Sequence, residues 1–279
     1  MSAQVHVHHD AEAAALAAAK RFIEVGQRAI EQQGRFCAAL AGGTTPIRMY
    51  EMLAEALHCG EPRPSTCEAP RGNSPKSKHE GRYLEHDDAL DWGLVHIFFS
   101  DERCVPSDHA DSNYAMVRRC LLDRVDVPEY QVHRIKSELV PYELAAERYD
   151  ALLRTFFCVS GARPSLKPTF DLVLLGVGED GHTASLFPGS QAVAEERRWA
   201  MHTQAPEGVE PRDRITLTLP VINAARRVIF LVSGANKSHV VRPLLAGLGD
   251  PGWPAALVRC AGSTEWHVDE AAAGIATGT

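Results

Sequence analysis

DLVLLGVGEDGHTASLFPG, residues 171–189, begins as an apolar run and ends in a turn rich in polar side chains. The apolar residues 172–175 have the length of a short buried strand, and the glycines that follow end it. His182 stands two residues after Asp180 in this turn, and such a pair can act as an oriented general base or acid. In open parallel sheets ligands bind at the carboxyl ends of the strands, so the stretch predicts an α/β fold with a site here. Taken alone, it fits a solvated glycine-rich turn about as well, and the other motifs decide between the two.

Helical and strand-like patterns alternate along the chain, which is typical of a mainly parallel sheet covered by helices. The patterns predict helices over residues 11–33, 47–57, 112–123 and 141–157, and another from about residue 236. They predict strands over residues 36–41, 95–99, 170–177, 228–232 and 257–261. A chain of 279 residues is long enough for one large α/β domain, and we expect a single domain over residues 1–279.

The charge balance excludes several classes of partner. The net charge is -7 and the isoelectric point is about 6.0, so no global basic field attracts nucleic acid or an anionic membrane. The seven cysteines are odd in number and lack C-x-x-C spacing, which favours free thiols in a reducing compartment. With no secretory leader and no run of eighteen apolar residues, we expect a cytoplasmic protein without a membrane span.

Two further segments stand outside the α/β pattern. Residues 59–90 are rich in proline, glycine and charge and poor in aliphatic residues, so we expect a flexible surface insertion there. Near the start, His6, His8 and His9 could bind a metal adventitiously, but a frayed or strand-like terminus explains them better. We therefore infer no metal site from the sequence.

Several polar groups are suited to binding a phosphate. Gly42, Gly43, Thr44 and Thr45 precede Pro46 at the start of a predicted helix, where backbone N–H groups, hydroxyls and the helix dipole favour an anion. A threonine can cap this helix and the proline can occupy its first position. The segment is neither a nucleotide P-loop nor a dinucleotide fingerprint.

Three cations could face the same crevice from loop positions, namely Arg103, Arg214 and Lys237. Asp101 lies beside Arg103 and could orient a base or form an ion pair. Cys104 suggests a nucleophile, but no histidine stands at a motif-like spacing from it, and a free cysteine is usually structural.

Five ordered motifs together resemble the 6-phosphogluconolactonase group of the glucosamine-6-phosphate isomerase/6-phosphogluconolactonase family. They are residues 41–46, residues 100–106 with 111–114, residues 176–189, residues 214–218, and Gly234 with Lys237. The resemblance covers roughly residues 11–261, and its main departure is the insertion. It implies a three-layer α/β/α fold with a mainly parallel Rossmann-like sheet, similar to the glucosamine-6-phosphate deaminase and ribose-5-phosphate isomerase type.

The resemblance implies an enzyme, a carboxylic-ester (lactone) hydrolase. Its reaction is hydrolysis of 6-phospho-D-glucono-1,5-lactone to 6-phospho-D-gluconate, the second step of the oxidative pentose phosphate pathway. His182 is then the general base, Asp180 holds it, and Arg103 and Asp101 act in catalysis or binding. The phosphate is held by Gly42, Gly43, Thr44, Thr45, Arg214 and Lys237. No cofactor and no metal is implied, the substrate is a small sugar-phosphate lactone, and we expect a monomer or weak homodimer.

Two rival functions remain open at this level. Glucosamine-6-phosphate deaminases share several of these turns, but their segment after Gly-His usually supplies a second carboxylate, and residues 183–188 contain no Glu. The second rival is a sugar-phosphate sensor fused to a DNA-binding regulator. Such a protein would carry a separate helix-turn-helix and a basic patch, whereas this chain is acidic overall.

Overall fold

The computed structural model describes residues 3–56, 90–159 and 168–275. The predicted insertion, residues 59–90, lies outside this part of the chain except for its last residue, Leu90, which is buried. Within the described residues, no helix is long and apolar enough to cross a membrane.

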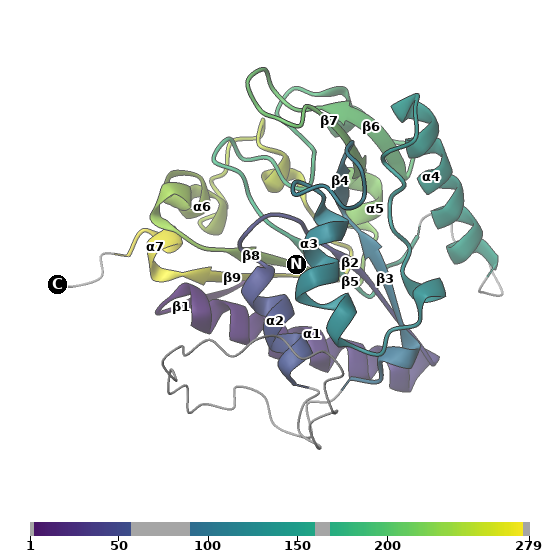
Figure 1. Cartoon of the computed structure of the whole chain (residues 1–279). Helices are drawn as coiled ribbons and strands as arrows, with labels where there is room; N and C mark the ends of the chain where they lie inside the picture. The colour runs from purple at the N-terminus through teal and green to yellow at the C-terminus, as the bar shows by residue number, and fades with distance from the viewer. Residues whose placement is uncertain (1–2, 57–89, 160–167, 276–279) are drawn as a thin grey trace, which may run out of the picture.

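A six-stranded parallel sheet, in the order β1-β9-β8-β5-β2-β3, forms the middle layer (Figure 1). Its strands are β1 (Gln4–His8), β2 (Phe36–Leu40), β3 (Val95–Phe99), β5 (Leu172–Leu175), β8 (Arg227–Val232) and β9 (Ser263–Asp269). Helices cover both faces and make the three-layer α/β/α arrangement that the sequence predicts. They are α1 (Ala11–Gln33), α2 (Ile47–Glu55), α3 (Asn113–Cys120), α4 (Tyr142–Val159), α5 (Leu219–Asn223), α6 (Ser238–Leu245) and α7 (Glu270–Ala273).

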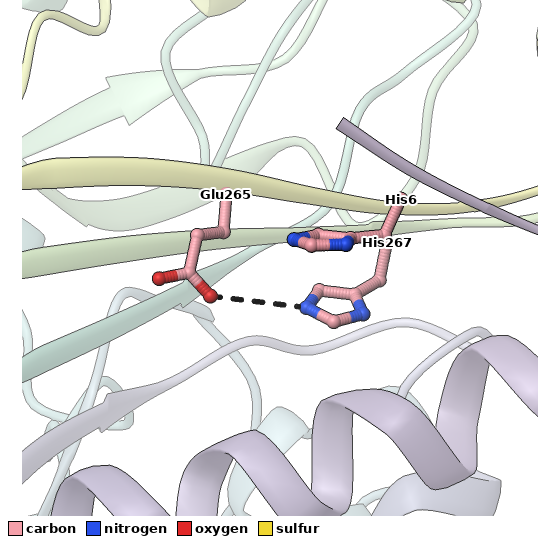
Figure 2. Close-up of side chains that lie close together, drawn as sticks. All are labelled: His6, Glu265 and His267. Atoms are coloured by element: carbon pink, nitrogen blue, oxygen red, sulfur yellow. Dashed lines mark ion pairs between the residues drawn. The ribbon is translucent and has the colours of Figure 1, made fainter. Parts of the chain in front are cut away.

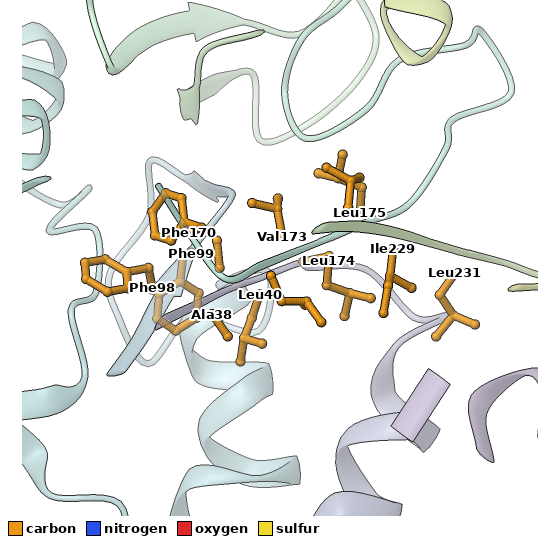
Figure 3. Close-up of a cluster of buried hydrophobic side chains, with 14 of the residues drawn as sticks. Ala38, Leu40, Phe98, Phe99, Phe170, Val173, Leu174, Leu175, Ile229 and Leu231 are labelled. Atoms are coloured by element: carbon orange, nitrogen blue, oxygen red, sulfur yellow. The ribbon is translucent and has the colours of Figure 1, made fainter. Parts of the chain in front are cut away.

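The central strands are buried on both faces. Val173 and Leu175 project to one face of β5 and Leu174 to the other, as alternation along a strand requires (Figure 3). Since helices cover both faces, each of these positions is apolar, which explains the continuous hydrophobic run in the sequence. The predicted strands in this region are confirmed.

Local sequence signals set the ends of α1. The Asp10 carboxylate accepts a hydrogen bond from the backbone N–H of Ala13 (2.8 Å), and Gly34 ends the helix with φ 74° while donating its N–H to Ile30. Alanines along the helix lie against the sheet and allow close approach. The helix predicted over residues 11–33 is confirmed with these bounds.

A second, antiparallel sheet was not predicted. It has the order β4-β7-β6 and consists of β4 (Asp101–Arg103), β7 (Asp213–Leu217) and β6 (Ala200–Gln204). The sequence led us to expect Arg103 and Arg214 in loops. The structure places them in paired strands instead. The strand β4 has three residues, all charged, so it carries no apolar pattern that would reveal it.

Two other expectations were wrong. Residues 257–261 are not the last strand, because a 3-10 helix, Pro254–Leu257, occupies the start of this segment and the strand follows at β9. That strand carries buried Glu265 and His267, so it does not look like a buried strand in the sequence. At α2, the helix begins at Ile47, Pro46 is the capping residue, and no side chain caps the helix.

Burial of a histidine pair makes the fold sensitive to acid. The Nδ1 atom of His96 lies 3.2 Å from Nε2 of His133, and the His133 ring stacks on Phe98. Burial, with a smaller contribution from His96, lowers the pKa of His133 from 6.5 to about 4. The unfolded chain therefore binds more protons than the native chain between these pH values, so stability is lost as the pH falls through this interval.

We expect His133→Phe, which keeps an aromatic ring but removes the titrating group, to lose less stability than the wild type between pH 7 and pH 4.5. Denaturant midpoints measured at both pH values give the comparison. Equal losses in the two proteins would contradict this role for His133.

Candidate active site

A cavity of about 390 Å³ opens at the carboxyl ends of β2, β5 and β8, beside the antiparallel sheet. Nine of the ten predicted site residues line it: Gly42, Gly43, Thr44, Thr45, Asp101, Arg103, His182, Arg214 and Lys237. The tenth, Asp180, does not line the cavity but contacts His182. The structure thus brings residues from five separate motifs to one place.

His182 and Asp180 form a hydrogen-bonded pair. The His182 Nδ1 atom lies 2.5 Å from Oδ1 of Asp180, and the same oxygen accepts the backbone N–H of His182 at 3.1 Å. Burial raises the pKa of the Asp180 carboxyl, but its hydrogen bonds with His182 outweigh this and lower the pKa overall. A carboxylate at Nδ1 fixes the tautomer in which Nδ1 carries the proton, so Nε2 has a free lone pair.

Gly178 leaves the space that this pair occupies. A Cβ atom at position 178 would lie 2.0 Å from Nδ1 of His182 and 2.6 Å from Oδ1 of Asp180. The turn is closed by backbone hydrogen bonds from Gly178 to His182 (2.9 Å) and from Gly181 to Gly178 (3.1 Å). The glycine-rich sequence of this turn therefore has a steric cause.

Asp101 is buried and connects the two sheets. Its Oδ2 accepts a hydrogen bond from the Ser185 hydroxyl at 2.7 Å, and its Oδ1 accepts one from Ser100 at 3.3 Å. Ser185 also donates its backbone N–H to the Thr216 hydroxyl at 3.2 Å. The loop that carries His182 is in this way fixed to β4 and β7.

The neighbouring Glu102 has a structural role. Its carboxylate accepts backbone N–H groups from Arg103, Asn113 and Tyr114 at 2.7–2.8 Å, and the Ser112 hydroxyl at 3.1 Å. Burial raises its pKa, and these hydrogen bonds oppose the rise. Glu102 therefore holds the start of α3 against β4, at the point where Arg103 leaves the strand.

Two guanidinium groups extend from directly opposed positions, because Arg103 and Arg214 are register partners in the antiparallel pair. Burial, and then the nearby Arg103 charge, lowers the pKa of Arg214. Among the described residues, the buried Nε atoms of both arginines have no hydrogen-bond partner. Like charges opposite one another destabilise a sheet, so this arrangement is suited to an anion that contacts both side chains.

The remaining wall combines the loop of residues 42–45 with Lys237. A Cβ atom at Gly42 would lie 1.9 Å from Oδ1 of Asn113, so the loop and the start of α3 touch through this glycine. Lys237 lies in a 3-10 helix, Ala235–Lys237, and its Nζ is 4.0 Å from Glu179.

Cys104 does not line the cavity. Burial raises the pKa of its thiol to about 12, and nearby carboxylates add to this effect, so the thiolate is disfavoured. Among the described cysteines, Cys37, Cys104, Cys120 and Cys260 are free thiols, as predicted.

Several residues of the cavity wall have no role that the sequence predicts. Ser185 and Asn113 lie within the motifs at residues 176–189 and 111–114. Their closeness in sequence to the predicted site residues could have identified them as part of the cavity wall. Val209 and Glu210 also line the cavity, and they come from a segment with no motif.

Comparison with known proteins decides the family. The family model described as glucosamine-6-phosphate isomerases/6-phosphogluconolactonase matches residues 9–62 and 72–266. This chain belongs to that family. It is 37% identical over 246 residues to a 6-phosphogluconolactonase of Synechocystis, covering 88% of this chain and 86% of the relative. It is 46% identical over 181 residues to the human 6-phosphogluconolactonase, covering 64% and 67% of the two chains.

Solved structures agree with the family. The fold matches the Trypanosoma brucei 6-phosphogluconolactonase with a TM-score of 0.75 at 29% identity, covering 98% of each chain. A monomeric glucosamine-6-phosphate deaminase matches with a TM-score of 0.72 at 20% identity, covering 98% of this chain and 100% of that one, and this similarity concerns the fold alone.

The clearance at Gly178 gives a steric test of the His182–Asp180 pair. We expect Gly178→Ala to lower kcat by about 100-fold, because displacing a catalytic group by about 1 Å can cost this much. Steady-state kinetics at saturating lactone measure the effect. A kcat within a few-fold of the wild-type value in Gly178→Ala would contradict the assignment.

Proposed function

We propose that this protein is a 6-phosphogluconolactonase that hydrolyses 6-phospho-D-glucono-1,5-lactone to 6-phospho-D-gluconate in the oxidative pentose phosphate pathway. The observation that carries the proposal is one cavity that contains both a carboxylate-oriented histidine and a pair of opposed arginines. The first group suits ester hydrolysis and the second suits a phosphate. Relatives named 6-phosphogluconolactonase, at 37–46% identity, support the same reaction.

The histidine performs the proton transfers. His182 Nε2 accepts a proton from water, and the resulting hydroxide adds to the lactone carbonyl carbon. Negative charge develops on the carbonyl oxygen, and the adjacent protonated His182 stabilises it. The tetrahedral intermediate then collapses, the bond from the carbonyl carbon to the ring oxygen breaks, and the protonated His182 returns its proton to that oxygen. Asp180 stabilises the imidazolium between the two transfers.

The cations bind the phosphate and so position the reacting ester. Arg103 and Arg214 stand opposite one another in the paired strands. One phosphate can therefore contact both guanidinium groups, which favours the phosphate as their shared partner. Lys237 and the loop of residues 42–45 complete the phosphate site from the other wall. Asp101 is held by Ser185, and we assign it to substrate positioning. The phosphate does not react, and its binding energy orients the lactone.

Deamination of glucosamine 6-phosphate is the nearest alternative reaction. The segment after His182, residues 183–188, contains no carboxylate that could serve as a second acid or base. Release of ammonia from glucosamine 6-phosphate separates the two activities directly, and we expect none.

The other properties follow from this function. We propose one 6-phosphogluconolactonase domain over residues 1–279 with an insertion at residues 59–90, acting in the cytoplasm as a monomer or weak homodimer. The reaction needs no redox cofactor and no metal, because water activated by His182 is a sufficient nucleophile.

The phosphate site predicts a defect in substrate binding. Arg214→Ala or Lys237→Ala should raise KM for the phosphorylated lactone at least tenfold, since a charge-assisted phosphate contact contributes roughly 1.5–3 kcal/mol. Arg118→Ala is the control, because Arg118 is exposed on α3 and pairs with Asp123. Unphosphorylated gluconolactone should be a poor substrate of the wild type. Unchanged KM values in both site variants would overturn the phosphate assignment.

His182→Ala should lower kcat by about 10²–10⁴, the usual contribution of a general base, with little change in KM. Cys104→Ser should remain active, which excludes a thiol acyl-enzyme. Rates are corrected for spontaneous hydrolysis of the lactone with an enzyme-free blank. If His182→Ala keeps more than a tenth of wild-type kcat, the base is another residue, with Asp101 the first candidate.

A further inference from the structure

Three histidines gather on one face of the sheet, away from the cavity. His6 and His8 project from the same side of β1, and His6 is the register partner of His267 on the adjacent β9. The rings of His6 and His267 stack with centroids 5.0 Å apart, and Glu265 lies beside them on the same face (Figure 2). None of these residues lines the cavity that holds His182.

The buried member of this group has an unsatisfied nitrogen. His267 is 5% exposed, and among the described residues its Nε2 atom has no hydrogen-bond partner. Its other nitrogen, Nδ1, lies 3.3 Å from Nε2 of His8. If Nδ1 donates to His8, Nε2 of His267 presents an unshared lone pair on the side of Glu265. Metal-binding histidines commonly have this arrangement, in which a neighbour holds one ring nitrogen and fixes the other for the metal.

Glu265 brings negative charge to the same place. Its Oε2 lies 4.0 Å from Nε2 of His267, too far for a hydrogen bond. The carboxylate also accepts hydrogen bonds from Arg21 (2.8 and 3.0 Å) and pairs with Arg227, while Arg21 pairs in turn with Glu24. The two glutamates offset part of the positive charge that Arg21 and Arg227 bring to this face.

We propose that His6, His267 and Glu265 bind a divalent transition-metal ion of the zinc type, with His8 positioning His267. One ligand atom from each of the three lies within 4.8 Å of the other two. Zn–N bonds of about 2.0–2.1 Å place tetrahedral ligands roughly 3.3 Å apart, so binding requires the ligand atoms to close by up to about 1.5 Å. His6 is exposed, so its ring can leave the stack with His267 and turn toward the ion, and water completes the coordination.

The ligand set selects the class of metal. Imidazole nitrogens suit zinc, copper and nickel, whereas magnesium and calcium prefer oxygen ligands. Because Arg21 and Arg227 share the carboxylate with the metal, the two histidines supply most of the affinity. The ion would connect the edge strand β1 to β9 and is not required by the hydrolytic reaction.

Zinc titration of the full-length protein, freed of metal with a chelator, tests the site. Calorimetry should show one zinc ion bound, and His6→Gln should weaken its Kd at least tenfold. His9→Gln is the matched control, because His9 lies three residues after His6, is exposed and pairs with Asp10. Its Kd should stay within twofold of the wild-type value. Both substitutions are at exposed positions and leave the core unchanged.

A second measurement identifies the ligand directly. The imidazole nitrogen resonances of His267 should shift when zinc binds to the wild type and should remain in place in His6→Gln. Equal zinc affinity in wild type and His6→Gln would overturn the proposal, including the case in which zinc binds at His182. Loss of binding in His9→Gln alone, or unshifted His267 resonances in zinc-saturated wild type, would also overturn it.

Discussion

The buried hydrogen bond between Ser185 and Asp101 is the contact on which the active cavity depends. It joins residues 84 positions apart in the chain, one in the loop after β5 and the other at the start of β4. The loop carries His182, and the strand carries Arg103. Because this bond is short and shielded from water, His182 and the cations are held in one relative position before any substrate arrives.

Two adjacent carboxylates of β4, Asp101 and Glu102, fix different parts of the chain around the cavity. Asp101 faces the cavity and binds the loop, whereas Glu102 points the other way and holds the backbone at the start of α3. Alternation along a strand sends successive side chains to opposite sides. Asp101 and Arg103 therefore line the cavity, and Glu102 between them holds α3. This strand of three residues therefore joins the loop after β5, the start of α3 and the cavity.

Sequence reasoning succeeded where burial left a simple pattern. The strands β2 and β5 are continuous apolar runs, and β3 and β8 contain one polar residue each, because helices cover both faces of the sheet. Strand prediction failed for β9, where a buried charged residue is stabilised by a partner from a distant part of the chain. In β9, Glu265 is buried because Arg21 reaches it from α1, and no local rule reveals such a partner.

The same limit applies to the site. Most of the cavity residues could be predicted from sequence motifs, because the polar residues that follow each apolar run lie at the end of a strand in the structure. The opposition of Arg103 and Arg214 was not predictable, since it depends on the register of two strands more than 100 residues apart. Through that register, backbone pairing assembles two positive charges as the chain folds. Any small dianion that enters the cavity meets the same two charges, so inorganic phosphate is expected to compete with the substrate there.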